Sequence, residues 1–276
     1  VVVMARELSL MQVANISREI KRRNITGPSG ELIRIEIFAH GALCMAVSGK
    51  CYMSLHSNYA SANRGACVQN CRRNYIVIDK EEGVEFEIDN EYIMSAKDLC
   101  TIDFLDKIIE SGVSVLKIEG RGRSADYVYT VINCYREAID AYYNGTYSND
   151  KFEDWKNRLA TVFNRGFWEG YYLGKTMGEW STEYGSKATK KKTYIGKGLK
   201  YFEKSGVAEF KLESHSLSPG DEILITGPST GVVQTTVEEI RVDDVHAEKI
   251  SKGTTFTIKI NERIRPSDKL YKLTTL

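Results

Sequence analysis

Short apolar runs alternate with helical patterns through the first half of the chain. The expected strands are 1–4, 32–41 and 113–118, and the expected helices are 9–24, 103–111 and 124–145. Strands separated by helices favour a parallel sheet with helical crossovers. These units are too few to close an eight-stranded barrel. We therefore expect residues 1–145 to form the C-terminal half of a (β/α) barrel, whose remainder is absent from this chain or supplied elsewhere.

The pattern changes in the second half of the chain. Residues 146–190 combine a short helix with glycine and aromatic residues, and we expect them to form a connector. From residue 191 the chain shows short alternating strands, separated by turns such as Ser218–Asp221 and Gly227–Pro228. This texture predicts a small antiparallel β-barrel as a C-terminal domain over 191–276.

The length and charge of the chain set broad limits on its class. A chain of 276 residues can bury enough apolar surface to fold without disulfides. Its 38 basic and 37 acidic residues give a net charge of +1, which favours no particular polyanionic partner. Nothing resembles a secretory leader, and no apolar run approaches the roughly 18 residues of a membrane span. We expect a cytoplasmic protein with no membrane partner.

Four of the six cysteines lie between Cys44 and Cys71. The full spacing is Cys44-x6-Cys51-x15-Cys67-x3-Cys71-x28-Cys100, with Cys134 alone in a helical pattern. Structural zinc sites usually use two tight knuckles, and only one pair here resembles a knuckle. Wide spacing suits an iron–sulfur cluster, whose core is bulkier. The alternative is that several of these cysteines are small buried apolar residues, as we expect for Cys134.

The stretch LKIEGRGRS gathers positive charge at the end of a predicted strand. Lys117 and Glu119 end the strand, and Arg121 and Arg123 follow it before a helix that begins at Ser124. Arginine forks and helix amides both favour anions, so this loop is a candidate site for a carboxylate. The alternative is a solvated turn with a structural Lys117–Glu119 pair.

Three further polar residues stand at predicted strand ends. Arg6 and Glu7 could face the same cavity, or they could form an ordinary ion pair. His40 is equally well explained as a site residue and as a histidine whose hydrogen bonds are satisfied within the fold.

A set of ordered motifs resembles one known family. EIFAHGALCMAVSGKCYMS at 36–54 is similar to the signature of the collagenase-like peptidase family of unknown catalytic type. Further motifs agree along most of the chain: ARELSL at 5–10, NRGACVQNCR at 63–72, SAKDLC at 95–100, LKIEGRGRSADYV at 116–128 and NRGFWEGYYLGK at 164–175. The arrangement resembles the branch that hydroxylates the wobble uridine of tRNA with prephenate as oxygen source.

The resemblance implies a 4Fe-4S cluster and a set of ligands. Carried over residue by residue, the ligands are Cys44, Cys51, Cys67 and Cys100, and Cys71 is a fifth candidate. It also implies tRNA as a partner and prephenate, a small dicarboxylic acid, as co-substrate. Arg121 or Arg123 would hold that acid.

Peptidase activity is the first alternative, because the family carries that name. The four histidines offer no pair spaced for a metalloprotease helix, and His40–Cys44 or Ser54–His56 are neighbours in sequence only. A non-catalytic RNA-binding module is the second alternative. Basic and aromatic residues interleave at the start of the tail domain and suit RNA, or they form a solvated linker: Lys187, Lys190, Lys191, Lys192, Tyr194, Lys197, Lys200, Tyr201, Phe202 and Lys204.

Overall fold

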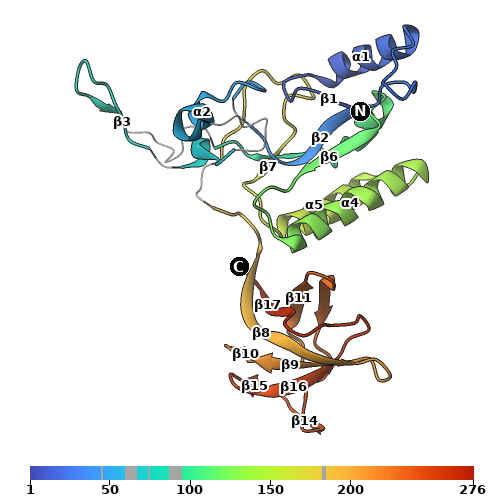
Figure 1. Cartoon of the computed structure of the whole chain (residues 1–276), viewed down its shortest axis with the longest axis vertical. Coiled ribbons are helices and arrows are strands. Elements are labelled where there is room, and N and C mark those ends of the chain that lie inside the picture. The colour runs from blue at the N-terminus through green and yellow to red at the C-terminus, as the bar shows by residue number, and fades with distance from the viewer. Residues whose placement is uncertain (45, 60–66, 74, 87–94, 182–184) are drawn as a thin grey trace. The chain divides into compact units, whose positions relative to one another are not determined.

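Strand β2 (Ile35–Ala42) is the centre of the sheet in the first part of the computed structural model (Figure 1). Along one edge it pairs in parallel with β6 (Val115–Glu119). Its other edge is shared by β1 (Val2–Val3), which is parallel, and β5 (Asp98–Cys100), which is antiparallel. Strand β7 (Phe167–Trp168) extends the sheet beyond β5. The strand that leads into the first cysteine is therefore held on both sides.

This sheet corrects the expected half of a (β/α) barrel. The antiparallel β2–β5 pair breaks the all-parallel order of such a barrel, and no pairing among the described residues closes the sheet. The first strand also differs from expectation: Val1, Val2 and Val3 are 64%, 43% and 45% exposed, where a buried strand was predicted. The observed form is an open mixed sheet accompanied by helices.

The helices follow the apolar periodicity of the sequence. They are α1 (Leu10–Arg22), α2 (Tyr52–Asn58), α3 (Leu105–Glu110), α4 (Ala125–Tyr143) and α5 (Asn149–Ala160). Ser9 caps α1 through a reciprocal box with Gln12. In α4 the buried Tyr135 hydroxyl donates to the Ala39 carbonyl at 2.8 Å and accepts from the Thr101 amide at 2.9 Å. One side chain thus fastens α4 to β2 and to the residue that directly follows β5.

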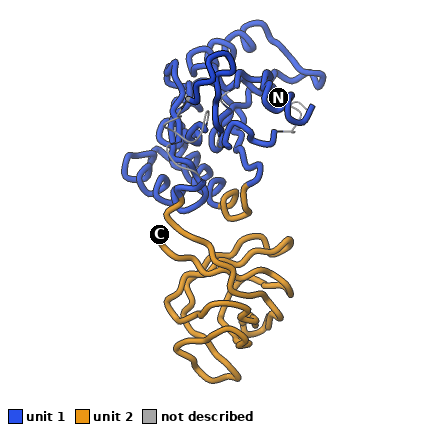
Figure 2. Tube along the Cα trace, turned by 90° about the vertical axis from the view of Figure 1, so that its left-hand side faces the viewer, with its two compact units in different colours: residues 1–122, 130–187 blue, residues 123–129, 188–276 orange. Residues whose placement is uncertain are grey.

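The chain separates into two units, coloured differently in Figure 2. Unit 1 holds residues 1–122 and 130–187, and unit 2 holds residues 123–129 and 188–276. The structure describes residues 1–44, 46–59, 67–73, 75–86, 95–181 and 185–276. Most of the stretch expected as a connector lies in unit 1, where it supplies α5 and β7. Unit 1 also carries a hairpin of β3 (Val77–Ile78) and β4 (Glu85–Phe86).

Unit 2 is built on an antiparallel sheet, as the tail sequence predicts. Its strands are β8 (Lys190–Phe202), β9 (Val207–Leu212), β10 (Ser216–Leu217), β11 (Glu222–Gly227), β12 (Gly231–Thr236), β13 (Arg241–Val242), β14 (Val245–His246), β15 (Ile250–Ser251), β16 (Thr255–Lys259) and β17 (Lys269–Thr275). Eight of them follow the order β12-β11-β17-β8-β9-β16-β13-β14, and β10 pairs with β15. Within the described residues no pairing joins β12 to β14, so the closed barrel of the expectation is not formed.

One glycine shows how tightly these strands approach. A Cβ atom at Gly196 would lie 2.1 Å from the Lys211 carbonyl oxygen, so β8 and β9 can meet here only through a residue without a side chain. Beneath the sheet, Ile195, Phe210 and Phe256 belong to one buried apolar cluster.

None of the helices in the described part of the chain has the length and apolar character needed to cross a membrane.

Candidate cysteine cavity

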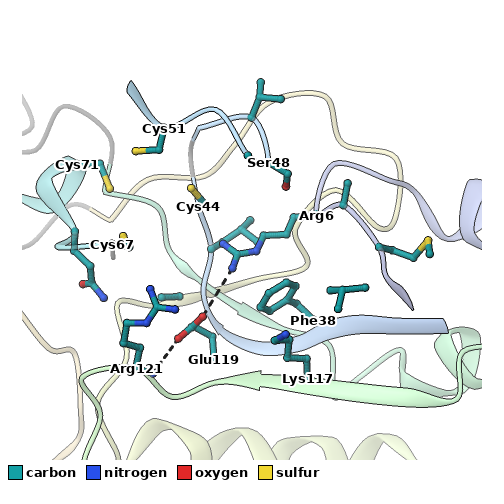
Figure 3. A pocket seen from close by; sticks show the side chains of 18 of the residues that line it. Arg6, Phe38, Cys44, Ser48, Cys51, Cys67, Cys71, Lys117, Glu119 and Arg121 are labelled. Carbon is teal, nitrogen blue, oxygen red and sulfur yellow. Dashed lines mark hydrogen bonds and ion pairs between the residues drawn. The ribbon is translucent and has the colours of Figure 1, made fainter. Parts of the chain in front are cut away.

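Four cysteines border one cavity in unit 1. Cys44, Cys51, Cys67 and Cys71 line a space of about 480 Å³, and Figure 3 shows them on the same side of it. All four are free thiols and half-buried. Burial raises the pKa of Cys44 and of Cys71, and the neighbouring thiols raise both further. Arg6 acts in the opposite direction on Cys44, as Arg72 does on Cys71.

Local structure brings these thiols together from three short segments. Cys44 lies two residues past the end of β2, and Cys51 is the N-cap residue of α2. The Cys51 thiol donates to the Ser54 hydroxyl at 3.3 Å. Cys71 lies in the 3-10 helix η2 (Asn70–Arg72), and the Asn70 amide donates to the Met53 carbonyl of α2 at 3.4 Å.

Arg72 ties the segment of Cys71 to the segment of Cys44. Its guanidinium donates to the carbonyls of Leu43 and Ala96, each at 3.0 Å, and the side chain is buried. Leu43 directly precedes Cys44. Charged donors to buried carbonyls make strong hydrogen bonds, so this arginine restrains the position of the cysteine loop.

Glu7 restrains the same loop on the other side of Cys44. Its carboxylate accepts from the Ser48 backbone amide at 2.7 Å. Glu7 was expected in the site, and the structure uses it to hold the backbone of the loop between Cys44 and Cys51. Arg6 itself lines the cavity, where its guanidinium lies 3.9 Å from the centre of the Phe38 ring and 3.9 Å from the Glu119 carboxylate.

The predicted cationic loop supplies a second wall. Lys117, Glu119 and Arg121 all line the cavity. Lys117 pairs with Glu36 at 2.9 Å, and the Glu119 carboxylate accepts from the Arg121 backbone amide at 2.9 Å. Figure 3 shows the Arg121 side chain directed toward the cysteines. Within the described residues its guanidinium makes no ion pair or hydrogen bond, so Arg121 is the cation best placed to meet a ligand.

Besides Glu7, three expected site residues do not border this cavity. Cys100 is buried on β5, and burial raises the pKa of its thiol to about 11. Its pairing partner across the sheet is His40, which is buried with its ring 5.6 Å from those of Tyr135 and Phe167. Arg123 is grouped with unit 2, and its guanidinium lies 5.4 Å from the centre of the Tyr127 ring.

The geometry bears on which metal the thiols could hold. No three His, Cys, Asp or Glu side chains in the described ranges come close enough to share a single metal ion. Zinc draws four ligands tightly around one atom, whereas four thiolates around an iron–sulfur cluster enclose a larger core. The four thiols on one side of this cavity match the number that such a cluster needs; Cys71 is one of them, and Cys100 is not.

The histidines do not form a protease-like arrangement with the cavity. Ser54 is buried and accepts from Cys51, whereas His56 is exposed on the same short helix. Residues two apart on a helix do not face each other. His40 contacts Tyr135, and the cavity lining contains no histidine.

Part of the tail's positive charge is paired within unit 2. Lys192 pairs with Asp126 at 2.6 Å, Lys197 pairs with Glu213 at 2.8 Å, and Lys190 pairs with Glu222. Lysines held by carboxylates are less available to phosphates. These pairs involve three of the lysines in the predicted RNA-binding stretch, and the prediction itself stays open.

Two residues of the site carry little signal in the sequence. Phe38 forms the apolar floor beneath Arg6, with the Lys117 ammonium 5.3 Å from the centre of its ring. Arg72 directly follows Cys71 and ends the motif at 63–72, and Phe38 lies in the motif at 36–54, so these motifs are the signals that could have pointed to both residues.

Comparisons with known proteins place this geometry in context. A family model described as peptidase family U32 matches residues 1–182. A protein named collagenase from Porphyromonas gingivalis is 60% identical over 272 residues, which cover 99% of this chain and 66% of that protein. The tRNA hydroxylation protein P1 of Bacillus subtilis is 32% identical over 279 residues, covering 98% of this chain and 63% of that protein. The chain thus spans about two thirds of the length of these relatives.

One solved structure resembles part of the chain. It is the C-terminal domain of a U32 peptidase from Geobacillus thermoleovorans, with a TM-score of 0.28 and 21% sequence identity. The match covers 29% of this chain and 91% of that domain.

Proposed function

We propose, from the premise that this chain belongs to peptidase family U32, that it is an RNA-modifying enzyme that depends on an iron–sulfur cluster. Its reaction would be the prephenate-dependent hydroxylation of the tRNA wobble uridine. The observation that carries this proposal is the cavity in which four thiols face Arg121, whose guanidinium pairs with no carboxylate among the described residues. A protease has no use for such a combination, whereas a redox site for an anionic co-substrate needs both parts.

The ligands of the proposed 4Fe-4S cluster are Cys44, Cys51, Cys67 and Cys71. When bound, such a cluster supplies one-electron redox chemistry. Arg72 and Glu7 hold the loop that carries the first two thiols. A site made of free thiols suits a reducing compartment, so we place the protein in the cytoplasm.

Arg121 would bind a carboxylate of the organic acid. Its guanidinium offers a planar fork of donors, and its backbone amide is held by Glu119. Arg6 is already engaged by the Phe38 ring and lies near Glu119, so it is suited to setting the charge of the cavity wall.

The choice of RNA as substrate is supported by the name of the Bacillus subtilis relative, a tRNA hydroxylation protein. Peptidase activity is the second candidate, and a specific observation favours it: the relative at 60% identity is named collagenase. The cavity offers a peptidase no histidine, and its cysteines would be occupied if they hold a cluster.

The deciding experiment purifies the chain without oxygen and measures iron, sulfide, zinc and visible absorption. We expect a brown protein with iron and sulfide. The same preparation is then assayed for hydroxylation of unmodified tRNA in the presence of prephenate, by nucleoside mass spectrometry, and for cleavage of denatured collagen. Collagen cleavage by a protein without iron would overturn the proposal in favour of the peptidase.

A further inference from the structure

The short helix α2 exposes the residues that a helix normally buries. Tyr52, Leu55 and Tyr59 are 73%, 50% and 92% exposed. Their spacing of three and four places them on one face of the helix and its C-cap. The opposite face is the one that packs, since Ser54 is buried and Met53 accepts from Asn70. Amphipathic helices usually have the reverse arrangement, so the exposed face is available to a partner.

This apolar face adjoins the cysteine cavity. Helix α2 begins directly after Cys51, which lines the cavity. Two more exposed apolar residues flank the other cavity segments: Val47, at 65%, precedes Ser48, and Val68, at 43%, follows Cys67. Val47 lines the cavity itself, and Tyr52 and Val68 directly follow the lining residues Cys51 and Cys67, so exposed apolar residues lie next in sequence to the cavity wall.

The charge of the same segment is one-sided. From Ile37 to Ile78 the sequence contains no aspartate or glutamate, although the whole chain has 37 acidic residues against 38 basic ones. The segment carries Lys50, Arg64, Arg72 and Arg73. Lys50 and Arg73 are exposed, and Arg64 lies outside the described residues. Such a segment attracts polyanions and offers no carboxylate that would repel them.

We infer that Tyr52 and Tyr59 form a platform on which unpaired RNA bases stack as the strand delivers its target nucleotide to the cysteine cavity. Exposed aromatics interleaved with cations are how proteins hold single-stranded RNA, because rings stack on bases while cations meet phosphates. The inference deepens the proposed function, since it rests on RNA being the substrate. A protein partner would also cover apolar residues, but it would not require the absence of acidic ones.

The position of Tyr59 supports a role outside the fold. It ends α2 in the left-handed region, with φ of 51°, where glycine or asparagine is usual. Its side chain is almost fully exposed, so packing within the described residues does not account for a tyrosine there.

The test measures RNA binding without turnover. Fluorescence anisotropy of labelled oligouridylate is followed with the full chain and its variants, prepared without oxygen. Tyr59→Ala and Tyr52→Ala should each weaken binding about tenfold, since each removes one stacked base. Tyr59→Phe keeps the ring and should bind normally. Lys50→Gln should reduce the slope of log affinity against log salt by about one unit.

The matched control is Tyr143→Ala, which removes a tyrosine of similar exposure, 72%, from the end of α4. It should leave affinity unchanged. Equal affinity in the Tyr52 and Tyr59 alanine variants and the parent would overturn the inference. So would unchanged RNA affinity together with a changed oligomeric state on size exclusion, because the face would then be a protein contact.

Iron content is measured on every variant, which separates this inference from the proposed function. A protein without iron that still loses RNA affinity on Tyr59→Ala would sustain the platform and refute the cluster. A protein that contains its cluster, and whose RNA affinity is unchanged when either tyrosine is replaced by alanine, would sustain the cluster and refute the platform.

Discussion

Arg72 donates a hydrogen bond of 3.0 Å to the carbonyl of Leu43, the residue that precedes the first thiol of the cavity. The arginine follows Cys71 in sequence, so a single side chain joins the first and last cysteines of the group. Its other branch reaches the Ala96 carbonyl, two residues before β5.

Replacing Arg72 by alanine should disorganise the cysteine cavity. Two buried carbonyls would lose their donor, which should lower the free energy of unfolding by about 2 kcal/mol or more. Iron per chain should fall well below that of the parent. Denaturant unfolding and iron analysis check the two effects. Arg73→Ala, which changes the exposed neighbour of Arg72, is the control. Equal iron content in the two variants would show that the hydrogen bonds of Arg72 are not needed to hold the cavity together.

Cys71 and Cys100 should respond differently to alanine. Cys71→Ala removes a thiol that lines the cavity, so the visible absorption of the cluster should be lost or altered. Cys100→Ala should keep the absorption, because its thiol is buried on β5, and should cost stability on the order of 1 kcal/mol. Absorption lost only in the Cys100 variant would restore the ligand set expected from the resemblance.

Arg121 and Arg123 form a matched pair two residues apart. Arg121→Ala should weaken prephenate binding roughly tenfold to a hundredfold, since a charge-assisted fork to a carboxylate is lost. Arg123→Ala should leave the affinity unchanged, because Arg123 does not line the cavity. Isothermal titration of each variant, with iron content as the control, decides the matter. Equal losses in both would assign the effect to general charge.

Glu137 should make stability depend on pH in the acid range. Its hydrogen bonds with Arg158, and then that with Trp155, lower the pKa of this carboxyl below its usual value. A lowered folded-state pKa stabilises the protein above the unfolded-state pKa, and that contribution is lost as pH falls through the folded-state value. Urea unfolding from pH 7 into the acid range should show a smaller decline for Glu137→Gln than for the parent. An identical decline would mean that the exposed pair is screened.

The sequence indicated that several cysteines would lie together, but it did not identify the fourth thiol of the cavity. Cys44 and Cys51 flank a short loop after a strand, and Cys67 and Cys71 are one turn apart, so local spacing indicates each pair. The ligand set implied by the resemblance instead took Cys100 and left Cys71 as a fifth candidate. Cys100 depends on the direction and register of β5. Successive strand residues face opposite sides of a sheet, and the antiparallel pairing with His40 directs Cys100 into the core near Tyr135.

The cationic loop shows the same limit at finer scale. The positive charge of this loop is evident from the sequence, but which of Arg121 and Arg123 lines the cavity is not. Gly122 adopts a φ of 69° between them, and Arg121 and Arg123 consequently fall on different parts of the structure. The three strands expected from the sequence do pair in parallel, whereas β5, which was not expected as a strand, runs opposite to β2.

The hydrogen bonds from Arg72 to the carbonyls of Leu43 and Ala96 also imply an order of events during synthesis. All four cavity thiols lie within residues 44–71, N-terminal to Ala96, so they leave the ribosome before Ala96 does. Until that carbonyl emerges, Arg72 lacks one of its two acceptors and the loop is held from one side only. The cysteine segment thus gains its second restraint only after Ala96, two residues before β5, has taken its place.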